Sequence, residues 1–352
     1  MLNNRRGLTG FVLIVALTLP LAAAPRKKNK VHDAKEKTAE SAPGAVLWRY
    51  PTDIASRNLF YGPGGKQHAP GATFIFVSED FSGSNPKYEV RDLAGNKWKI
   101  KLGPEARPEI AATRLVWAVG YFTNEDYYIP EVQVQNLPSH VKRGQKWIGP
   151  GGIMRDVRLK RYPKGEKKLG DWQWKHNPFI GAQPFNGLRI LMAVINSWDL
   201  KDDNNAVYQE ARPGRPNLPS RIYMVKDLGS SFGTTGQSWT DAKSKGNLKS
   251  YRRSRFITRE TPGYVDFAVP TRPSLDYLIV LPQFMTDLRS HWIGKHIPRA
   301  DAKWLGQLLA QLSPSQIGDA FRAAGYSPQQ AAGFTQVIEV RIRDLNQLGP
   351  EN

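Results

Sequence analysis

The sequence predicts an α+β protein with two lobes, a small β-rich N-terminal lobe with one main helix and a mostly helical C-terminal lobe. Segments with strand-like alternation and one helical segment come first, and segments with apolar residues at helical spacing come last. The 352 residues, 40% hydrophobic and 11% aromatic, are enough for one large domain or for two lobes around a shared core.

The residue composition limits the kinds of functional site and partner that the chain can have. The chain contains 0 cysteines, which excludes a disulfide framework, a thiolate metal site and a cysteine nucleophile. The formal net charge of +19 favours an anionic partner such as a nucleotide, a phosphorylated molecule, an acidic polysaccharide or a membrane surface. The basic residues do not form one stripe interleaved with aromatic residues, so we do not expect a nucleic acid as partner.

The N-terminus resembles an export signal. Arg5 and Arg6 are followed by the apolar run FVLIVALTLPLAAA, which ends in small residues suited to cleavage. This run is shorter than the roughly 20 residues of a comfortable membrane span. We therefore expect residues 1–24 to be a signal peptide, the mature protein to be periplasmic or secreted without a stable membrane span, and residues 25–45 to be a disordered basic linker.

Residues 46–136 are predicted to form the N-terminal lobe. TFIFV (73–77), KYEVRD (87–92) and KWKIKL (97–102) are expected strands, the last one alternating polar and apolar residues as a half-buried strand does. The loop between the first two contains Ser82, Gly83 and Ser84. A helix is predicted within 104–122, closed by Gly120, and a further extended segment within 126–137.

Residues 137–184 are predicted to be an irregular insertion rich in lysine, glycine, proline and tryptophan, with short strands such as 152–162. The stretches QKWIGPGG and DWQWKHN place tryptophan beside cationic residues, a combination that suits stacking on a sugar or contact with an acidic acceptor. An ordinary packed insertion with tryptophan in the core explains the same residues.

Residues 185–349 are predicted to form the C-terminal lobe. A buried helix at 185–195 leads into the polar stretch NSWDLKDDNNAVY, and a proline-rich loop from 211 to 220 leads into a buried strand that ends in Asp227-Leu228-Gly229. The remaining predicted elements are helices, the last two of which begin with Ser-Pro, a helix-start signal: 272–297, 301–312, 313–326 and 327–348.

Two of these motifs together resemble the catalytic core of the protein-kinase-like superfamily. Asp199-x-Lys201-x-x-Asn204 after a buried helix resembles its D-x-K-x-x-N catalytic loop, and Asp227-Leu228-Gly229 resembles its metal-binding turn. The two aspartates lie 28 residues apart (227 − 199), more than in typical protein kinases, and the proline-rich loop accounts for the excess.

The sequence also departs from the typical pattern. Ser197-Trp198 precedes Asp199 where ordinary protein kinases carry His-Arg, the loop from Ser82 to Pro86 has one glycine, and no Ala-Pro-Glu closes an activation segment. The resemblance is therefore to the atypical, exported kinase-like proteins.

The resemblance implies a role for each motif residue. Asp199 would accept or orient the proton of the acceptor, and Lys201 would neutralise charge on the transferred phosphoryl group. Asn204 and Asp227 would hold Mg²⁺ or Mn²⁺, hard cations that prefer oxygen ligands.

The resemblance implies ATP as donor and the N-terminal lobe as its binding lobe. Lys101 would bind the nucleotide phosphates while an ion pair with Glu109 holds it in place, with Lys99 and Glu105 as the alternatives. The loop of Ser82, Gly83 and Ser84 would lie over the phosphates.

Three functions follow as hypotheses. The first is an exported phosphotransferase that moves a nucleotide phosphoryl group to a hydroxyl acceptor on a protein, glycan or small molecule. The second is a non-catalytic, pseudokinase-type binding protein for a carbohydrate or protein partner. The third is a glycan-processing enzyme with Asp199 and Asp227 as its carboxylate pair. At residue level, the alternatives are a solvated loop at 199–205 and attraction of Glu109 to the helix dipole.

Overall fold

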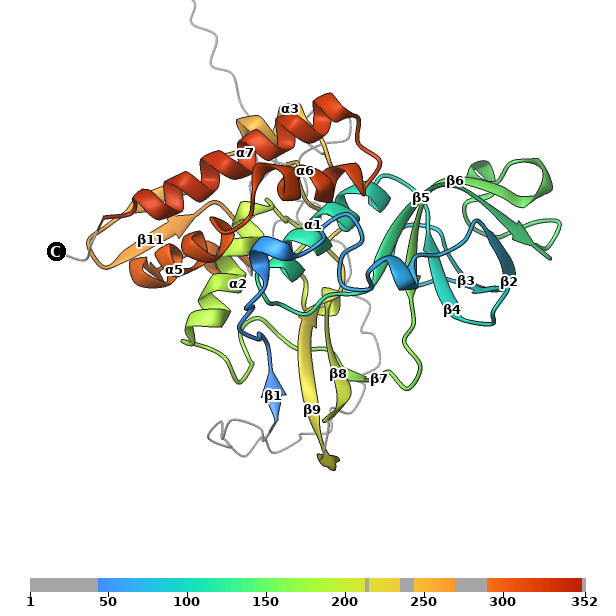
Figure 1. Ribbon diagram of the computed structural model, residues 1–352, viewed down its shortest axis with the longest axis horizontal. Coiled ribbons are helices and arrows are strands. Elements are labelled where there is room, and N and C mark those ends of the chain that lie inside the picture. The colour runs from blue at the N-terminus through green and yellow to red at the C-terminus, as the bar shows by residue number, and fades with distance from the viewer. Residues whose placement is uncertain (1–43, 213–214, 235–243, 270–289, 350–352) are drawn as a thin grey trace, which may run out of the picture. The chain divides into compact units, whose positions relative to one another are not determined.

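Five strands close into a barrel in the computed structural model, which describes residues 44–212, 215–234, 244–269 and 290–349 (Figure 1). The barrel order is β2-β3-β4-β6-β5, with β2 pairing parallel to β5 and the other neighbours antiparallel. Alternate side chains, among them Phe74, Tyr88 and Ile100, fill the interior. The strands are β2 Thr73–Asp80, β3 Lys87–Asp92, β4 Lys97–Lys101, β5 Asp126–Gln135 and β6 Ile153–Arg161.

Strand β6 comes from the stretch expected to be an irregular insertion with short strands. It pairs with β4 on one side and β5 on the other, so it is the strand that closes the barrel. Lys101 lies opposite Arg158 in this pairing. The register thus brings a second cation next to the lysine singled out from the sequence.

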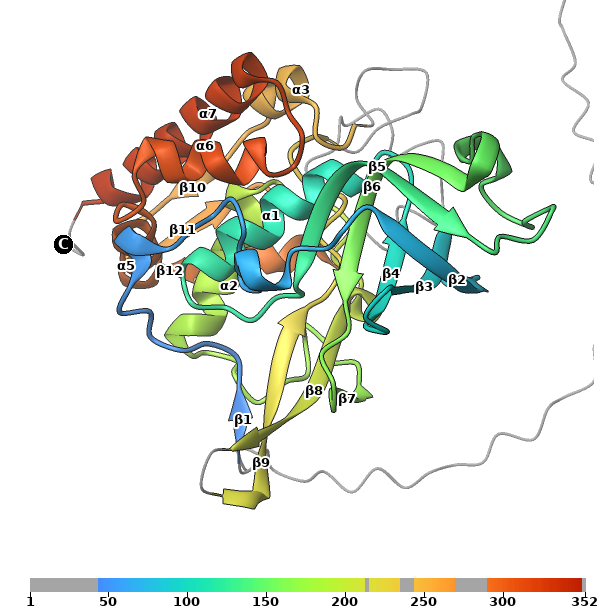
Figure 2. The same ribbon diagram turned by 45° about the vertical axis from the view of Figure 1, so that its right-hand side comes forward.

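Helix α1 (Ala106–Ala118) connects β4 to β5 and packs against β5, β6 and α6 (Figure 2). The helix ends at Ala118, two residues before the glycine predicted to close it. Gly120 has a φ of 97°, and a Cβ on it would lie 2.3 Å from the carbonyl oxygen of Arg49. Only glycine fits there, because the left-handed conformation and the close backbone both exclude a side chain.

A second sheet has the strand order β1-β9-β8-β7, and only its β8 and β9 follow α2 (Gln183–Val194) in the chain. The proline-rich stretch 211–220, expected to be a loop, is instead mostly strand, so that prediction was wrong. Ala206, Tyr208 and Met224 form a small apolar cluster in this hairpin, which shows why the chain pairs here. The strands are β1 Ala45–Val46, β7 Lys167–Gly170, β8 Asn205–Arg212 and β9 Arg215–Val225.

The C-terminal part is mostly helical and shares one large apolar core with α1 and α2. Ser313 and Ser327 cap the two helices that begin with Ser-Pro, each in a reciprocal capping box with a glutamine three residues on. The helices are α3 Leu248–Arg253, α5 Arg299–Leu309, α6 Pro314–Arg322 and α7 Pro328–Gln347, and a small sheet consists of β10 Ile257–Glu260, β11 Tyr264–Phe267 and β12 Ile297–Pro298.

The α+β class with strands and one helix first and helices last is thus confirmed. Most of the predicted helix 272–297 lies outside the described residues, and its described end holds a 3-10 turn, His291–Gly294, and β12. The predicted signal peptide and nearly all of the predicted linker also lie outside them.

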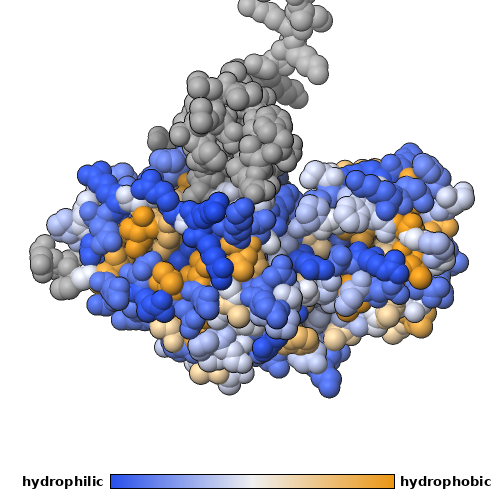
Figure 3. Space-filling model, turned by 90° about the horizontal axis from the view of Figure 1, so that it is seen from above, coloured by the Kyte–Doolittle hydropathy of each residue, from blue (hydrophilic) through white to orange (hydrophobic). Residues whose placement is uncertain are grey.

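The surface agrees with the composition. Seen from above in Figure 3, the described face is mostly hydrophilic, with apolar patches between charged residues. Within the described part of the chain, no helix has the length and apolar character required to cross a membrane.

Candidate functional site

A buried lysine forms the centre of the candidate site. Lys101 is the last residue of β4 and is 1% exposed. Its Nζ lies 2.6 Å from Glu105 Oε2, 2.9 Å from Glu109 Oε2 and 3.2 Å from Asp227 Oδ1. A buried ammonium requires this compensation, because desolvation otherwise disfavours the charged form. The structure therefore joins the barrel, α1 and the Asp-Leu-Gly turn through one cation.

The start of α1 supplies two of the three carboxylates. Glu105 is the N-cap residue and Glu109 lies one turn further on, so both side chains face the same side. The side chain of Glu105 makes no capping hydrogen bond to the helix; it binds Lys101 and Lys245 instead. The two glutamates weighed as alternatives in the sequence thus both contact Lys101.

Lys99 has a different environment. Its Nζ lies 2.6 Å from Asp80 Oδ2 and 3.2 Å from Glu89 Oε1. It is bound within the hairpin of β2 and β3, and it is Lys101 that reaches the carboxylates of α1 and of Asp227.

A second cation compensates the same carboxylates. Arg158 on β6 binds Glu109 and lies 3.6 Å from Asp126 Oδ1. Burial alone would raise the pKa of Asp227, but Lys101 and Arg158 hold it well below its usual range. For Glu109, burial outweighs the same two cations and raises the pKa. Asp227 is therefore more firmly ionised than Glu109.

The loop with Asp199 is fastened to the turn with Asp227. The carbonyl of Asn204 accepts hydrogen bonds from the backbone N–H of Lys226 at 2.8 Å and of Asp227 at 3.3 Å. The Asn204 side chain donates from Nδ2 to the Asp199 carbonyl at 2.6 Å. One asparagine thus sets the position of both aspartates.

Asp199 and Lys201 form an ion pair, with 2.9 Å between Lys201 Nζ and Asp199 Oδ1. Partial burial would lower the pKa of Lys201, but its hydrogen bond to Asp199 raises it. Both side chains are partly exposed, and the negative charge of Glu105 also contributes to raising the pKa of Lys201. The pair is accessible to a substrate.

The loop of Ser82, Gly83 and Ser84 connects β2 to β3 and is exposed. The carbonyls of Gly83 and Asn85 accept hydrogen bonds from Arg143 Nη2 at 2.9 and 3.0 Å, and the Ser82 amide donates to Asp80 Oδ1 at 2.8 Å. The Pro86 carbonyl accepts from the Leu102 amide, which places the loop next to the end of β4. The described contacts link none of the three predicted residues directly to Lys101.

Trp198, the residue before Asp199, has a structural role. Its backbone N–H donates to the Ser230 carbonyl at 3.1 Å, and its indole Nε1 donates to the Ser244 carbonyl at 3.3 Å. Lys245 Nζ lies 5.3 Å above the ring and also binds Glu105. Trp198 therefore packs beneath a lysine that reaches the start of α1.

The oxygen donors at this position suit a divalent cation held together with phosphates. Asp227 supplies an ionised carboxylate, and Asn204 keeps its side-chain oxygen available because its Nδ2 binds Asp199. Within the described ranges no three His, Asp or Glu side chains form a complete metal cage. Mg²⁺ binds through one or two carboxylates and takes the rest of its shell from water and substrate phosphates, so Asp227 and Asn204 would be sufficient protein ligands.

Sequence reasoning missed Arg158, Asp126 and Lys245. Arg158 could have been found only by pairing β4 with β6 in register, and Lys245 comes from a segment with no motif. Asp126, at 0% exposure, begins β5 and carried no signal beyond being an acid at a strand start.

No protein-family model and no curated protein match the chain. Among solved structures, the Helicobacter pylori proinflammatory kinase CtkA aligns at 10% identity and a TM-score of 0.43 over 79% of this chain and 97% of its own. The Rio2 kinase of Chaetomium thermophilum, in its ADP/Mg²⁺-phosphoaspartate complex, aligns at 12% identity and 0.30, over 76% and 72%. The Golgi casein kinase aligns at 11% and 0.33, over 80% and 73%. All three TM-scores lie below 0.5.

Proposed function

We propose that the protein is an exported kinase-like phosphotransferase that moves the terminal phosphoryl group of ATP to a hydroxyl acceptor with Mg²⁺ or Mn²⁺. The observation that supports this most directly is Lys101, buried between Glu105, Glu109 and Asp227. A lysine held by helix carboxylates opposite a metal-binding aspartate is the arrangement that positions nucleotide phosphates in kinases.

In the proposed reaction the acceptor oxygen forms a bond to the γ-phosphorus, the bond between that phosphorus and the β–γ bridging oxygen breaks, and ADP leaves. The hydroxyl proton passes to the Asp199 carboxylate. Lys201, already paired with Asp199 at 2.9 Å, compensates charge on the moving phosphoryl group. This chemistry needs positioning and charge compensation more than covalent participation of the protein.

Lys101 would bind the donor phosphates while keeping its ion pairs with Glu105 and Glu109 at the start of α1. Its distances to Glu105 and Glu109 are 2.6 and 2.9 Å, and its distances to the two Asp227 oxygens are 3.2 and 3.3 Å. The Asp227 contact is the longest, so it is the one we expect to exchange. When bound, Mg²⁺ neutralises phosphate charge, and Asn204 and Asp227 are the residues that would hold it.

Export remains part of the proposal on the strength of residues 1–24 alone, which lie outside the described structure. Mass spectrometry of the protein recovered from cell fractions tests it. Export predicts a mature N-terminus near residue 24 in the exported fraction, and an intact N-terminus inside the cell contradicts it.

The nucleotide site is tested by thermal unfolding of the mature protein with and without ATP and Mg²⁺ or Mn²⁺. A ligand that binds only the folded state stabilises it by about 2.7 kcal/mol at a concentration 100 times its Kd. We expect a metal-dependent rise in Tm that is lost in Asp227→Asn and retained in Asp319→Asn. Asp319 is a suitable control because it pairs with Arg322 on the surface of α6.

If no nucleotide shifts the Tm in the presence of either metal, the phosphotransferase proposal fails and a non-catalytic binding protein takes its place. If the shift persists in Asp227→Asn, the nucleotide binds but the assigned metal ligand is wrong.

A further inference from the structure

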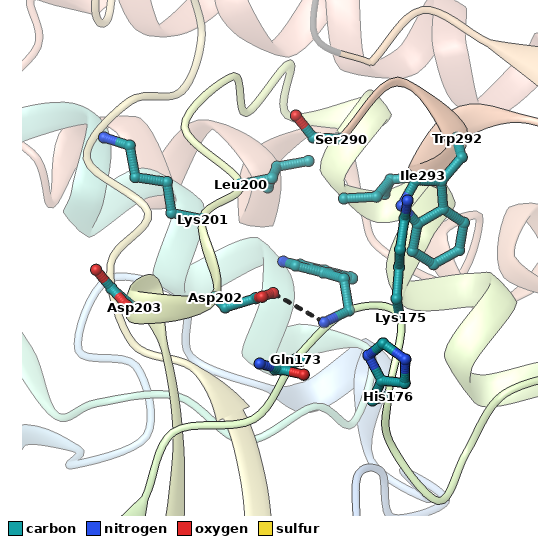
Figure 4. A pocket seen from close by; sticks show the side chains of 11 residues that line it. Gln173, Lys175, His176, Leu200, Lys201, Asp202, Asp203, Ser290, Trp292 and Ile293 are labelled. Carbon is teal, nitrogen blue, oxygen red and sulfur yellow. Dashed lines mark hydrogen bonds between the residues drawn. The ribbon is translucent and has the colours of Figure 1, made fainter. Parts of the chain in front are cut away.

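A cavity of about 500 Å³ lies beside the loop with Asp199 and Lys201 (Figure 4). Its walls come from three segments far apart in the sequence: 173–176, 200–203 and 290–293. The volume lies within the usual range for small-molecule sites. The first of these segments is part of the tryptophan-bearing stretch DWQWKHN.

The floor of this cavity is apolar and its rim is polar. Buried or half-buried side chains form the floor, namely Trp174, Leu200, Trp292 and Ile293. The remaining lining residues at the rim are exposed, apart from the buried Ser290. Figure 4 shows Lys175 beside Trp292 and Ile293 with His176 next to it, Asp202 and Asp203 on the opposite side, and Gln173 between the two groups.

The floor also holds a buried donor with nothing to bind. Trp174 is 2% exposed, and among the described residues its indole Nε1 has no hydrogen-bond partner. Its backbone N–H, in contrast, donates to Asp202 Oδ1 at 3.0 Å. An unpaired buried N–H costs free energy, so the floor carries an unsatisfied donor.

The charges at the rim balance. Asp202, Asp203, Lys175 and Lys201 all line the cavity, so two carboxylates and two ammonium groups are present, and Gln173 adds an amide that both donates and accepts. A strongly anionic ligand would meet two carboxylates here and a strongly cationic one two ammonium groups. A neutral molecule with many hydroxyls and an apolar face suits the mixture of donors, acceptors and aromatic rings.

Lys201 connects this cavity to the proposed reaction centre. It lines the cavity, and its ammonium binds Asp199 at 2.9 Å. A ligand hydroxyl at that edge would be adjacent to the proposed proton acceptor.

From these observations we propose that the cavity binds the acceptor and that the acceptor is a sugar, free or part of a glycan, which presents one hydroxyl at the Lys201 edge. This inference deepens the proposed function and rests on it for the direction of the chemistry. The binding itself does not depend on a nucleotide.

The test is saturation-transfer NMR on the mature protein without nucleotide, titrating methyl glycosides of glucose, galactose, N-acetylglucosamine and glucuronic acid. Polyglutamate serves as an anionic, non-sugar comparison. Trp292→Ala removes an aromatic floor residue, and Gln173→Ala removes a rim amide at an exposed position that is not expected to affect folding.

Trp147→Ala is the matched control, since Trp147 is 38% exposed in the barrel lobe and, like Trp292, has a cation over its ring. We expect at least one glycoside to bind, with affinity reduced about tenfold in Trp292→Ala and severalfold in Gln173→Ala, and unchanged in Trp147→Ala. This result supports the proposal.

Failure of the whole panel to bind, equal loss in the Trp147 control, or binding of polyglutamate alone would overturn it. The nucleotide-dependent Tm shift separates the two proposals. Sugar binding without that shift leaves a saccharide-binding protein and removes the transferase, whereas the shift without sugar binding leaves the transferase with another acceptor.

Discussion

Replacing Lys101 by methionine should be far more damaging than the same change at Lys99, two residues away on the same strand. Lys101 is 1% exposed and contacts three carboxylates, whereas the Lys99 side chain is 20% exposed and contacts two. Removing one partner of a buried ion pair costs about 3–5 kcal/mol, because an uncompensated buried charge remains. A pair closer to the surface contributes about 0–1 kcal/mol.

The pH dependence of the Lys101→Met effect is a sharper test than its size. In the wild type, burial would raise the pKa values of Glu105 and Asp227, but Lys101 and neighbouring cations hold both below their usual range. Their contribution is present above the unfolded pKa values and is lost as pH falls through the folded ones. Without Lys101 we expect burial to dominate, so that these carboxyls bind protons in the folded state at a pH where the unfolded chain has lost them. The variant then loses stability as pH rises from about 5 to 8.

Urea unfolding at pH 5 and pH 8 measures both effects. With a slope of about 3 kcal/mol/M, a loss of 3–5 kcal/mol lowers the midpoint by about 1–2 M. We expect Lys101→Met to show this loss at pH 8 and a smaller one at pH 5, and Lys99→Met to change little at either pH. Equal losses for the two variants, or a Lys101→Met loss that does not depend on pH, would refute this account of the cluster.

Three further predictions concern other parts of the molecule. Burial lowers the pKa of Lys160 to about 8, so the wild type should gain about 3 kcal/mol of stability between pH 8 and 10.5. Lys160→Met should remove that gain and raise the Tm at pH 7. Thermal unfolding from pH 7 to 10.5 measures both effects. A Cβ on Gly229 would lie 2.7 Å from the Cβ of Glu105, so Gly229→Ala should lower the free energy of unfolding in urea by about 1–3 kcal/mol. It should also weaken the nucleotide-dependent Tm shift. An unchanged shift would show that the position of Glu105 does not affect nucleotide binding. Ser327→Ala removes the side chain that accepts the Gln330 amide and should cost about 1 kcal/mol, without any effect on ligand binding.

Local patterns predicted most of the regular elements. Alternation located the strands around residues 73–101, and Ser313 and Ser327 located two helix starts because a capping residue followed by proline acts within one turn. The end of β9 was predicted as a buried strand, but β8 and the proline-rich start of β9 were missed because prolines indicate a loop, whereas the pairing depends on partners across the sheet.

The candidate site, too, could be predicted from local motifs only in part. The motifs were sufficient to single out Lys101, Glu109 and Asp227, which the structure brings into contact. Arg158 and Lys245 approach the same carboxylates through strand register and chain packing, which involve residues about 50 to 140 positions apart. Contacts of this kind cannot be predicted from the spacing of motifs in a single sequence.

The carbonyl of Asn204 has a consequence for how this protein can change over evolution. It accepts the amides of Lys226 and Asp227, so the two ends of the hairpin formed by β8 and β9 are fixed to each other at the site. Residues can be gained or lost at the far end of the hairpin without altering the spacing of Asp199 and Asp227 in space. The long interval between the two motifs is therefore a tolerant insertion point, and the same position is suited to an engineered tag or reporter peptide.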